Sequence, residues 1–102
     1  MPRITLTIKH SDGLHARPAS LFVQTVNKFN CEVVVICGNR SVNAKSIIGV
    51  LSLGANHGSV IEIVAEGIDA EAVLDALQSL VENNFSLQEK QPDNSSQTNE
   101  MR

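Results

Sequence analysis

The residues best suited to chemistry stand together in the run Asp12-Gly13-Leu14-His15-Ala16-Arg17-Pro18. Gly13 permits a tight turn. Pro18 is tolerated in the first turn of a helix, where its missing N–H costs no helical hydrogen bond. The order of these residues predicts a turn followed by a helix that begins at Ala16, with His15 at or near the N-cap.

A helix that begins in this way favours an anion beside His15. Its first backbone N–H groups have no acceptor inside the helix and carry partial positive charge, so they can hold a phosphate. Because Pro18 has no N–H, the expected donors are the backbone amides of Ala16 and Arg17. The Arg17 guanidinium adds two N–H groups that can pair with phosphate oxygens.

The imidazole of His15 is the group that we expect to react. The field of the helix N-terminus disfavours the protonated ring, and a neutral ring keeps a lone pair for attack on phosphorus. A lone histidine before a helix is usually only a surface cap residue. Its combination with Gly13, Arg17 and Pro18 instead predicts that His15 accepts a phosphoryl group.

Ser46 is the second candidate site. It can cap a short helix over Ile47 to Leu53, with Gly54 as the stop signal. That helix has more apolar residues than one side can bury, and an exposed apolar patch usually marks a partner surface. The apolar residues expected to face solvent and partners beside Ser46 are Ile47, Ile48 and Leu51.

Hydrophobic periodicity predicts the elements that position both sites. Alternating and β-branched runs predict strands over residues 3–9, 31–37, 40–43 and 60–66, with a hairpin turn at Gly38-Asn39. Helical periodicity predicts longer helices over residues 16–28 and from an Asp69 cap to about residue 83. The order βαββαβα indicates an α+β fold, in which a four-stranded, mainly antiparallel sheet carries the helices on one face.

Composition limits the function classes. The chain has 102 residues, a length that fits one domain. Its net charge of -3 argues against nucleic acid as a partner. It has no apolar run of about 20 residues that could span a bilayer, and its N-terminus does not resemble a signal peptide. We expect a cytoplasmic protein with one domain over residues 1–85 and a disordered polar tail over residues 86–102.

The cysteines and the remaining histidines predict no cofactor chemistry. On a strand, Cys31 and Cys37 would lie ~20 Å apart, whereas a disulfide needs Cα atoms within ~7 Å. His10 and His57 lie in loops separate from that of His15, and no carboxylate cluster joins them. We therefore expect neither a metal nor a cofactor.

The string Gly-Leu-His-Ala-Arg-Pro-Ala, residues 13–19, resembles the active-site motif of the HPr family. These are the histidine-containing phosphocarriers of the phosphoenolpyruvate-dependent sugar phosphotransferase system (PTS). The resemblance covers residues 3 to about 85. It implies an open-faced β-sandwich and phosphorylation at Nδ1 of His15. It also implies enzyme I as donor, sugar-specific enzyme II (IIA) proteins as acceptors, and a stoichiometric carrier rather than an enzyme with its own turnover.

Residues 45–54 are similar to the regulatory segment of HPr proteins from low-GC Gram-positive bacteria. This similarity implies phosphorylation of Ser46 by an ATP-dependent HPr serine kinase/phosphorylase, and a catabolite-control transcription regulator as a further partner. A phosphate on Ser46 would be stabilised by the helix N-terminus, so the fold need not break. We expect its charge to weaken docking to enzyme I.

The partner surface is expected to combine the exposed residues beside Ser46 with three residues of the first long helix, which are Ser20, Leu21 and Gln24. Many family members have lysine at the positions of Gln24 and Asn27, so electrostatic steering should be weaker here. Asp12 also departs from the Asn or Ser common in the family, and its carboxylate would repel a nearby phosphate. A monomer is expected, because partners need faces that a dimer would cover.

Other functions fit part of the pattern. A regulatory module of the same fold would act through Ser46 alone, although such relatives usually lack the histidine. A carrier of this kind could also serve nitrogen control or a dihydroxyacetone kinase, and the Ser46 segment favours carbon metabolism. An independent enzyme is disfavoured, because the domain is small and its acid and base residues are scattered.

Overall fold

The computed structural model describes residues 1–11 and 13–85; the predictions for Asp12 and for residues 86–102 fall outside the described residues. The elements occur in the predicted order βαββαβα. They are β1 (Arg3–Thr7), α1 (Ala16–Val26), β2 (Glu32–Cys37), β3 (Arg40–Asn43), α2 (Ile47–Ser52), β4 (Val60–Glu66) and α3 (Ala70–Glu82).

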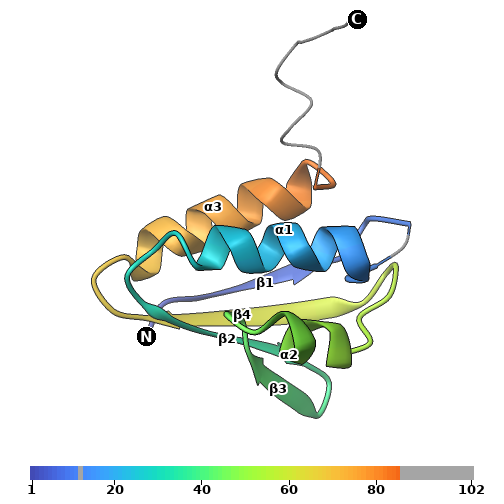
Figure 1. Cartoon of the computed structure of the whole chain (residues 1–102), viewed down its shortest axis with the longest axis horizontal. Coiled ribbons are helices and arrows are strands. Elements are labelled where there is room, and N and C mark those ends of the chain that lie inside the picture. The colour runs from blue at the N-terminus through green and yellow to red at the C-terminus, as the bar shows by residue number, and fades with distance from the viewer. Residues whose placement is uncertain (12, 86–102) are drawn as a thin grey trace, which may run out of the picture.

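The four strands form one sheet in the order β1-β4-β2-β3, and every neighbouring pair is antiparallel. The central strand β4 pairs Ile61 with Leu6 of β1 and Ile63 with Val35 of β2. Helices α1 and α3 lie side by side over one face of this sheet (Figure 1). Helix α2 packs against α1 and β3. The predicted open-faced β-sandwich is therefore confirmed.

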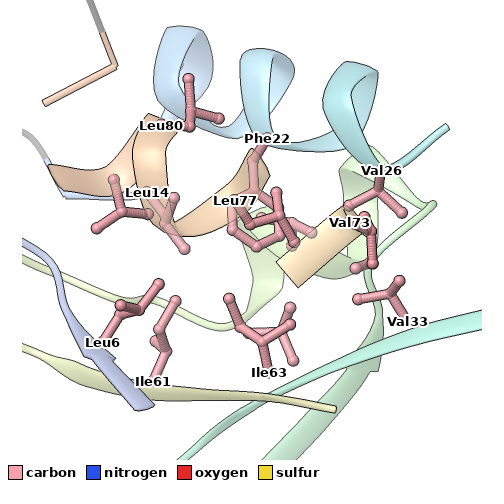
Figure 2. Close-up of a cluster of buried hydrophobic side chains, with 14 of the residues drawn as sticks. Leu6, Leu14, Phe22, Val26, Val33, Ile61, Ile63, Val73, Leu77 and Leu80 are labelled. Carbon is pink, nitrogen blue, oxygen red and sulfur yellow. The ribbon is translucent and has the colours of Figure 1, made fainter. Parts of the chain in front are cut away.

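The core lies between the helices and the sheet. Side chains of both long helices and of the central strands converge there (Figure 2), and Phe22, Leu77 and Ile63 are completely buried. Alternation along the strands turns the other set of side chains to the helix-free face, where Arg3 forms an ion pair with Glu62. This division explains why the strands are apolar on one side only.

Helix α1 ends at Val26, before the predicted residue 28. The amides of Lys28 and Phe29 donate to Thr25 and Val26, three residues back, and such bonds tighten and end a helix. The side-chain amide of Asn27 donates to the carbonyl of Lys45, just before α2, at 3.4 Å. The end of α1 is therefore tied to the beginning of α2.

The predicted cap at Asp69, the N-cap residue of α3, is correct in position, but the side chain does not form the capping hydrogen bond. The carboxylate instead accepts a hydrogen bond from the backbone amide of Asn30 at 2.7 Å. The backbone at Asp69, with φ -98° and ψ 21°, departs from the extended geometry typical of a capping residue.

In the described part of the chain, no helix has both the length and the apolar character needed to cross a bilayer. The two cysteines are free thiols; Cys31 is buried and Cys37 is half-buried.

Candidate functional site

The segment that leads into α1 is fixed against the loop that follows α2. The amide of Leu14 donates to the carbonyl of Ala55 at 2.8 Å, and the amide of Gly13 donates to the carbonyl of His10 at 2.9 Å. Gly13 has a φ of 67°, a conformation that side-chain-bearing residues rarely adopt. The predicted turn before the helix is confirmed.

His15 is the N-cap residue of α1, as the sequence predicts. Its backbone is extended, with φ -100° and ψ -162°, and its carbonyl accepts the amide of Ala19 at 2.8 Å. Within the described residues, its imidazole makes no cap hydrogen bond to the helix. The side chain is exposed. The ring is therefore reachable from solvent and is not used to stabilise the helix end.

The first turn of α1 has the features expected of an anion site. Ala16 and Arg17 are the first two helical residues, and backbone amides at these positions have no acceptor within the helix. Both residues are exposed, whereas Pro18 is buried and fixes the start of the helix. Residues 16–19 include one guanidinium and no carboxylate. An anion at His15 would therefore meet positive charge from α1.

Ser46 is the N-cap of α2, as predicted. Its Oγ accepts a hydrogen bond from the amide of Gly49 at 3.1 Å, and its carbonyl accepts the amide of Val50 at 3.0 Å. The residue is exposed. Ser46 therefore supports the helix through its hydroxyl, and the residue is exposed to solvent at the same time.

The apolar residues beside Ser46 divide as the sequence predicts. Val50 and Leu53 are buried in the core. The α2 patch, as we call the exposed set, consists of Ile47, Ile48 and Leu51, which are 38%, 76% and 39% exposed.

The predicted partner residues of α1 lie five to nine residues beyond His15, on the helix that packs against α2. Ser20 and Leu21 are half-buried and Gln24 is exposed. The Gln24 side-chain amide donates to the Ser20 hydroxyl at 3.1 Å. These residues and the α2 patch therefore belong to two helices in contact, and their role in partner binding stays a prediction.

His15 and Ser46 lie at opposite ends of this helix pair. Leu14 joins the beginning of α1 to the loop after α2, whereas Asn27 joins the end of α1 to the segment before α2. The two helices thus run in opposite directions. Since α1 has 11 residues, a distance of about 16 Å separates its ends. The α2 patch lies on the helix between the two sites.

Two contacts of the loop before α1 were not predicted from the sequence. One is the hydrogen bond to Ala55. The other is an edge-to-face ring contact between His10 and Phe85, with ring centroids 5.9 Å apart. Phe85 is buried and follows α3. Sequence signals near these contacts, such as Gly13 and Gly54, indicate turns but do not show which segments meet.

No group of three potential metal ligands occurs among residues 1–11 and 13–85. His10, His15 and His57 are therefore not gathered into such a group.

Comparison with known proteins identifies the family. Residues 2–83 match the family model described as "PTS HPr component phosphorylation site". The chain is 47% identical over 79 residues to phosphocarrier protein HPr of Haloferax volcanii, covering 76% of this chain and 89% of the relative. It is 43% identical over 75 residues to the HPr-like protein Crh of Halalkalibacterium halodurans, covering 74% and 89%.

A solved structure agrees with these matches. HPr from Thermoanaerobacter tengcongensis superposes with a TM-score of 0.82 at 49% identity, covering 83% of this chain and 96% of that chain. The sequence and structure comparisons together show that the chain belongs to the HPr family of phosphocarrier proteins.

Proposed function

We propose that this chain carries phosphoryl groups in the PTS, accepting them from enzyme I on His15 and passing them to IIA proteins. The observation that carries the proposal is the exposed imidazole of His15 at the N-cap of α1, unused by the helix and followed by Arg17. An imidazole in this place can receive a phosphoryl group and give it up again without unfolding any element.

From this chain, the transfer needs only the imidazole, backbone amides and guanidinium of the site. The lone pair of Nδ1, the nitrogen implied by the family resemblance, attacks phosphorus on the phosphorylated donor. A P–N bond forms while the bond to the donor breaks, and the donor keeps that electron pair. The amides of Ala16 and Arg17 and the Arg17 guanidinium stabilise the phosphoryl oxygens. The reverse displacement by an acceptor nucleophile restores the free ring.

In this proposal the chain is a stoichiometric carrier in the cytoplasm, and each copy holds one phosphoryl group on His15. Its partners dock on the α2 patch and on Ser20, Leu21 and Gln24. The α2 patch is apolar and exposed, which is typical of a docking surface. The chain acts as a monomer, so that this surface remains free.

The deciding experiment is transfer of labelled phosphate from phosphoenolpyruvate through purified enzyme I. We expect an acid-labile phosphate on His15 and its loss in His15→Ala. The matched control is His57→Ala, because His57 is also exposed but lies in the loop before β4. Labelling of His15→Ala at the wild-type level would overturn the proposal.

A second function has its own support. Ser46 is exposed beside the α2 patch, and Crh, a protein named as HPr-like, is among the relatives. We propose that ATP and a serine kinase phosphorylate Ser46, which shifts the chain from enzyme I toward a catabolite-control transcription regulator. An acid-stable phosphate that disappears in Ser46→Ala is the expected result. A chain labelled at Ser46 but never at His15 would be a regulatory module instead of a carrier.

A further inference from the structure

We propose that the loop after α2 positions His15 for phosphoryl transfer, through the backbone carbonyl of Ala55. This inference rests on the proposed function, since the reaction that it tunes is phosphorylation of His15. Ala55 acts through its hydrogen bond to Leu14, so it is a positioning residue rather than a catalytic one. Three observations support this role.

The first observation is the hydrogen bond from the amide of Leu14 to the carbonyl of Ala55, with an N–O distance of 2.8 Å. Leu14 directly precedes His15, and its side chain is 1% exposed. Ala55 is completely buried. A buried backbone hydrogen bond therefore fixes the main chain one residue before the imidazole.

The second observation is the close approach of two backbone segments at Gly13. A Cβ atom at this position would lie 2.4 Å from the Ala55 carbonyl oxygen and 2.7 Å from the Asn56 Cα atom. Both are backbone atoms, so moving a flexible side chain could not relieve the clash. Glycine therefore allows the loop before α1 to lie directly on the loop after α2.

The third observation is that the same loop also holds the other end of this segment. The amide of Ile8 donates to the carbonyl of Ser59 at 2.8 Å, and the amide of Gly58 donates to the carbonyl of Ile8 at 2.7 Å. The chain from Ile8 to Leu14 is thus bonded at both ends to residues 55–59. The position of His15 depends on this second loop as well as on α1.

Such support matters because phosphoryl transfer needs reacting atoms about 3–3.5 Å apart, and a misplacement of about 1 Å can cost 10²-fold in rate. The carbonyl of the N-cap residue His15 accepts a helical hydrogen bond from Ala19, but the backbone φ and ψ of His15 are extended rather than helical. We infer that α1 alone does not fix the imidazole and that the Ala55 contact supplies the missing constraint.

The first test compares Gly13→Ala with Gly38→Ala. Both positions have positive φ, 67° and 62°, so both substitutions impose backbone strain. Among the described residues other than its two chain neighbours, however, no heavy atom lies within 4 Å of a Cβ added at Gly38. We expect Gly13→Ala to lower the kcat of enzyme I, with this chain as acceptor, by about 10²-fold at unchanged KM. Gly38→Ala should keep the wild-type kcat.

A second variant removes only the hydrogen bond, in case Gly13→Ala does not fold. Replacing the Leu14 backbone amide by an ester deletes its N–H, and ligation at the Asn30–Cys31 junction gives access to residues 1–30 by synthesis. The matched control is an ester at Phe29, whose amide donates to Val26 at 3.1 Å at the far end of α1. We expect the Leu14 ester, and not the Phe29 ester, to lower kcat.

The ¹⁵N chemical shifts of the His15 ring give a reading that does not depend on phosphorylation. We expect them to move in Gly13→Ala and in the Leu14 ester and to stay in both controls. If wild-type chain takes no phosphate, the proposed function fails, and the ring shifts alone decide whether Ala55 positions His15. If the wild type is phosphorylated but the folded test variants match their controls in kcat and ring shifts, the positioning inference fails.

Discussion

The Oγ of Ser46 accepts a hydrogen bond from the amide of Gly49 at 3.1 Å, and this contact gives Ser46 a structural role independent of phosphorylation. Alanine at this position removes the acceptor. Aspartate keeps an acceptor, because Asp is as good an N-cap residue as Ser, and adds a negative charge. Two substitutions at one position therefore separate the cap from the charge.

Ser46→Asp is expected to weaken docking to enzyme I without destabilising the fold. The added carboxylate lies beside the α2 patch and would lose water when a partner covers it, at a cost of about 1 kcal/mol or more. The KM of enzyme I for this chain should rise about fivefold or more. Steady-state phosphorylation of His15 measures this value, and an unchanged KM would refute the proposed inhibition.

Ser46→Ala should show the opposite pattern. Loss of the cap is expected to lower the free energy of unfolding by about 1 kcal/mol, measured by urea denaturation. The KM for enzyme I should stay near that of the wild type. If Ser46→Ala raised KM as much as Ser46→Asp, the cap rather than the charge would govern docking.

Ile48 is expected to be an energetic centre of the α2 patch. Its side chain is 76% exposed, so Ile48→Ser should change stability by no more than about 0.5 kcal/mol. If a partner buries this side chain, its loss should cost about 1–2 kcal/mol, or 5- to 30-fold in the Kd for enzyme I. Titration calorimetry with unphosphorylated enzyme I measures the change.

The matched control for Ile48 is Ile68→Ser. Ile68 is 87% exposed and lies between β4 and α3, so the substitution removes the same apolar surface from a different part of the molecule. We expect its Kd for enzyme I to equal that of the wild type. Equal losses at both positions would mean that general surface hydrophobicity, and not the α2 patch, drives the binding.

Sequence patterns predicted those elements whose signals are local. Strands β3 and β4 have the predicted bounds, because alternation there is sharply ended by turn residues such as Gly38 and Gly67. The N-cap positions of His15 and Ser46 follow from the same kind of local signal. The end of α1 was predicted too late, because Asn27 and Lys28 carry no strong stop signal and the helix tightens before them.

The remaining features depend on contacts between distant residues. Asp69 is a residue type that often caps helices, but its carboxylate accepts a hydrogen bond from the amide of Asn30, which only the folded chain brings near. The carbonyl of Ala55 and the ring of Phe85 reach the loop before α1 in the same way. No single-sequence pattern reports which backbone atom will lie opposite a given loop.

The buried thiol of Cys31 is expected to make the folded chain less stable at alkaline pH. Burial raises the pKa of its thiol above 9.0, although the charge of Lys45 opposes this shift. The folded chain therefore holds this proton more tightly than the unfolded chain does. The contribution of this proton to the free energy of unfolding is complete below pH 9.0, and it is lost as pH rises through the pKa of the thiol in the folded chain.

Urea denaturation of the wild type and of Cys31→Ala from pH 8 to 10.5 tests this expectation. Cys31→Ala should be less stable than the wild type at pH 8, because it removes buried volume, but its free energy of unfolding should fall less steeply as pH rises. Val33→Ala is the matched control, since it also removes buried volume but no thiol, and it should keep the wild-type slope. A wild-type slope in Cys31→Ala would contradict the prediction.

Phe85 is expected to mark the end of the stable domain. It is 6% exposed, its amide donates to the carbonyl of Leu80 at 2.8 Å, and its ring contacts His10. A chain of residues 1–85 should therefore unfold at the same urea concentration as the full chain. Phe85→Ala in that shorter chain should lose about 3–5 kcal/mol, the usual cost of removing a buried phenylalanine side chain. A clear loss of stability on deleting residues 86–102 alone would instead place the boundary of the domain beyond Phe85, and the proposed limits of 1–85 would be wrong.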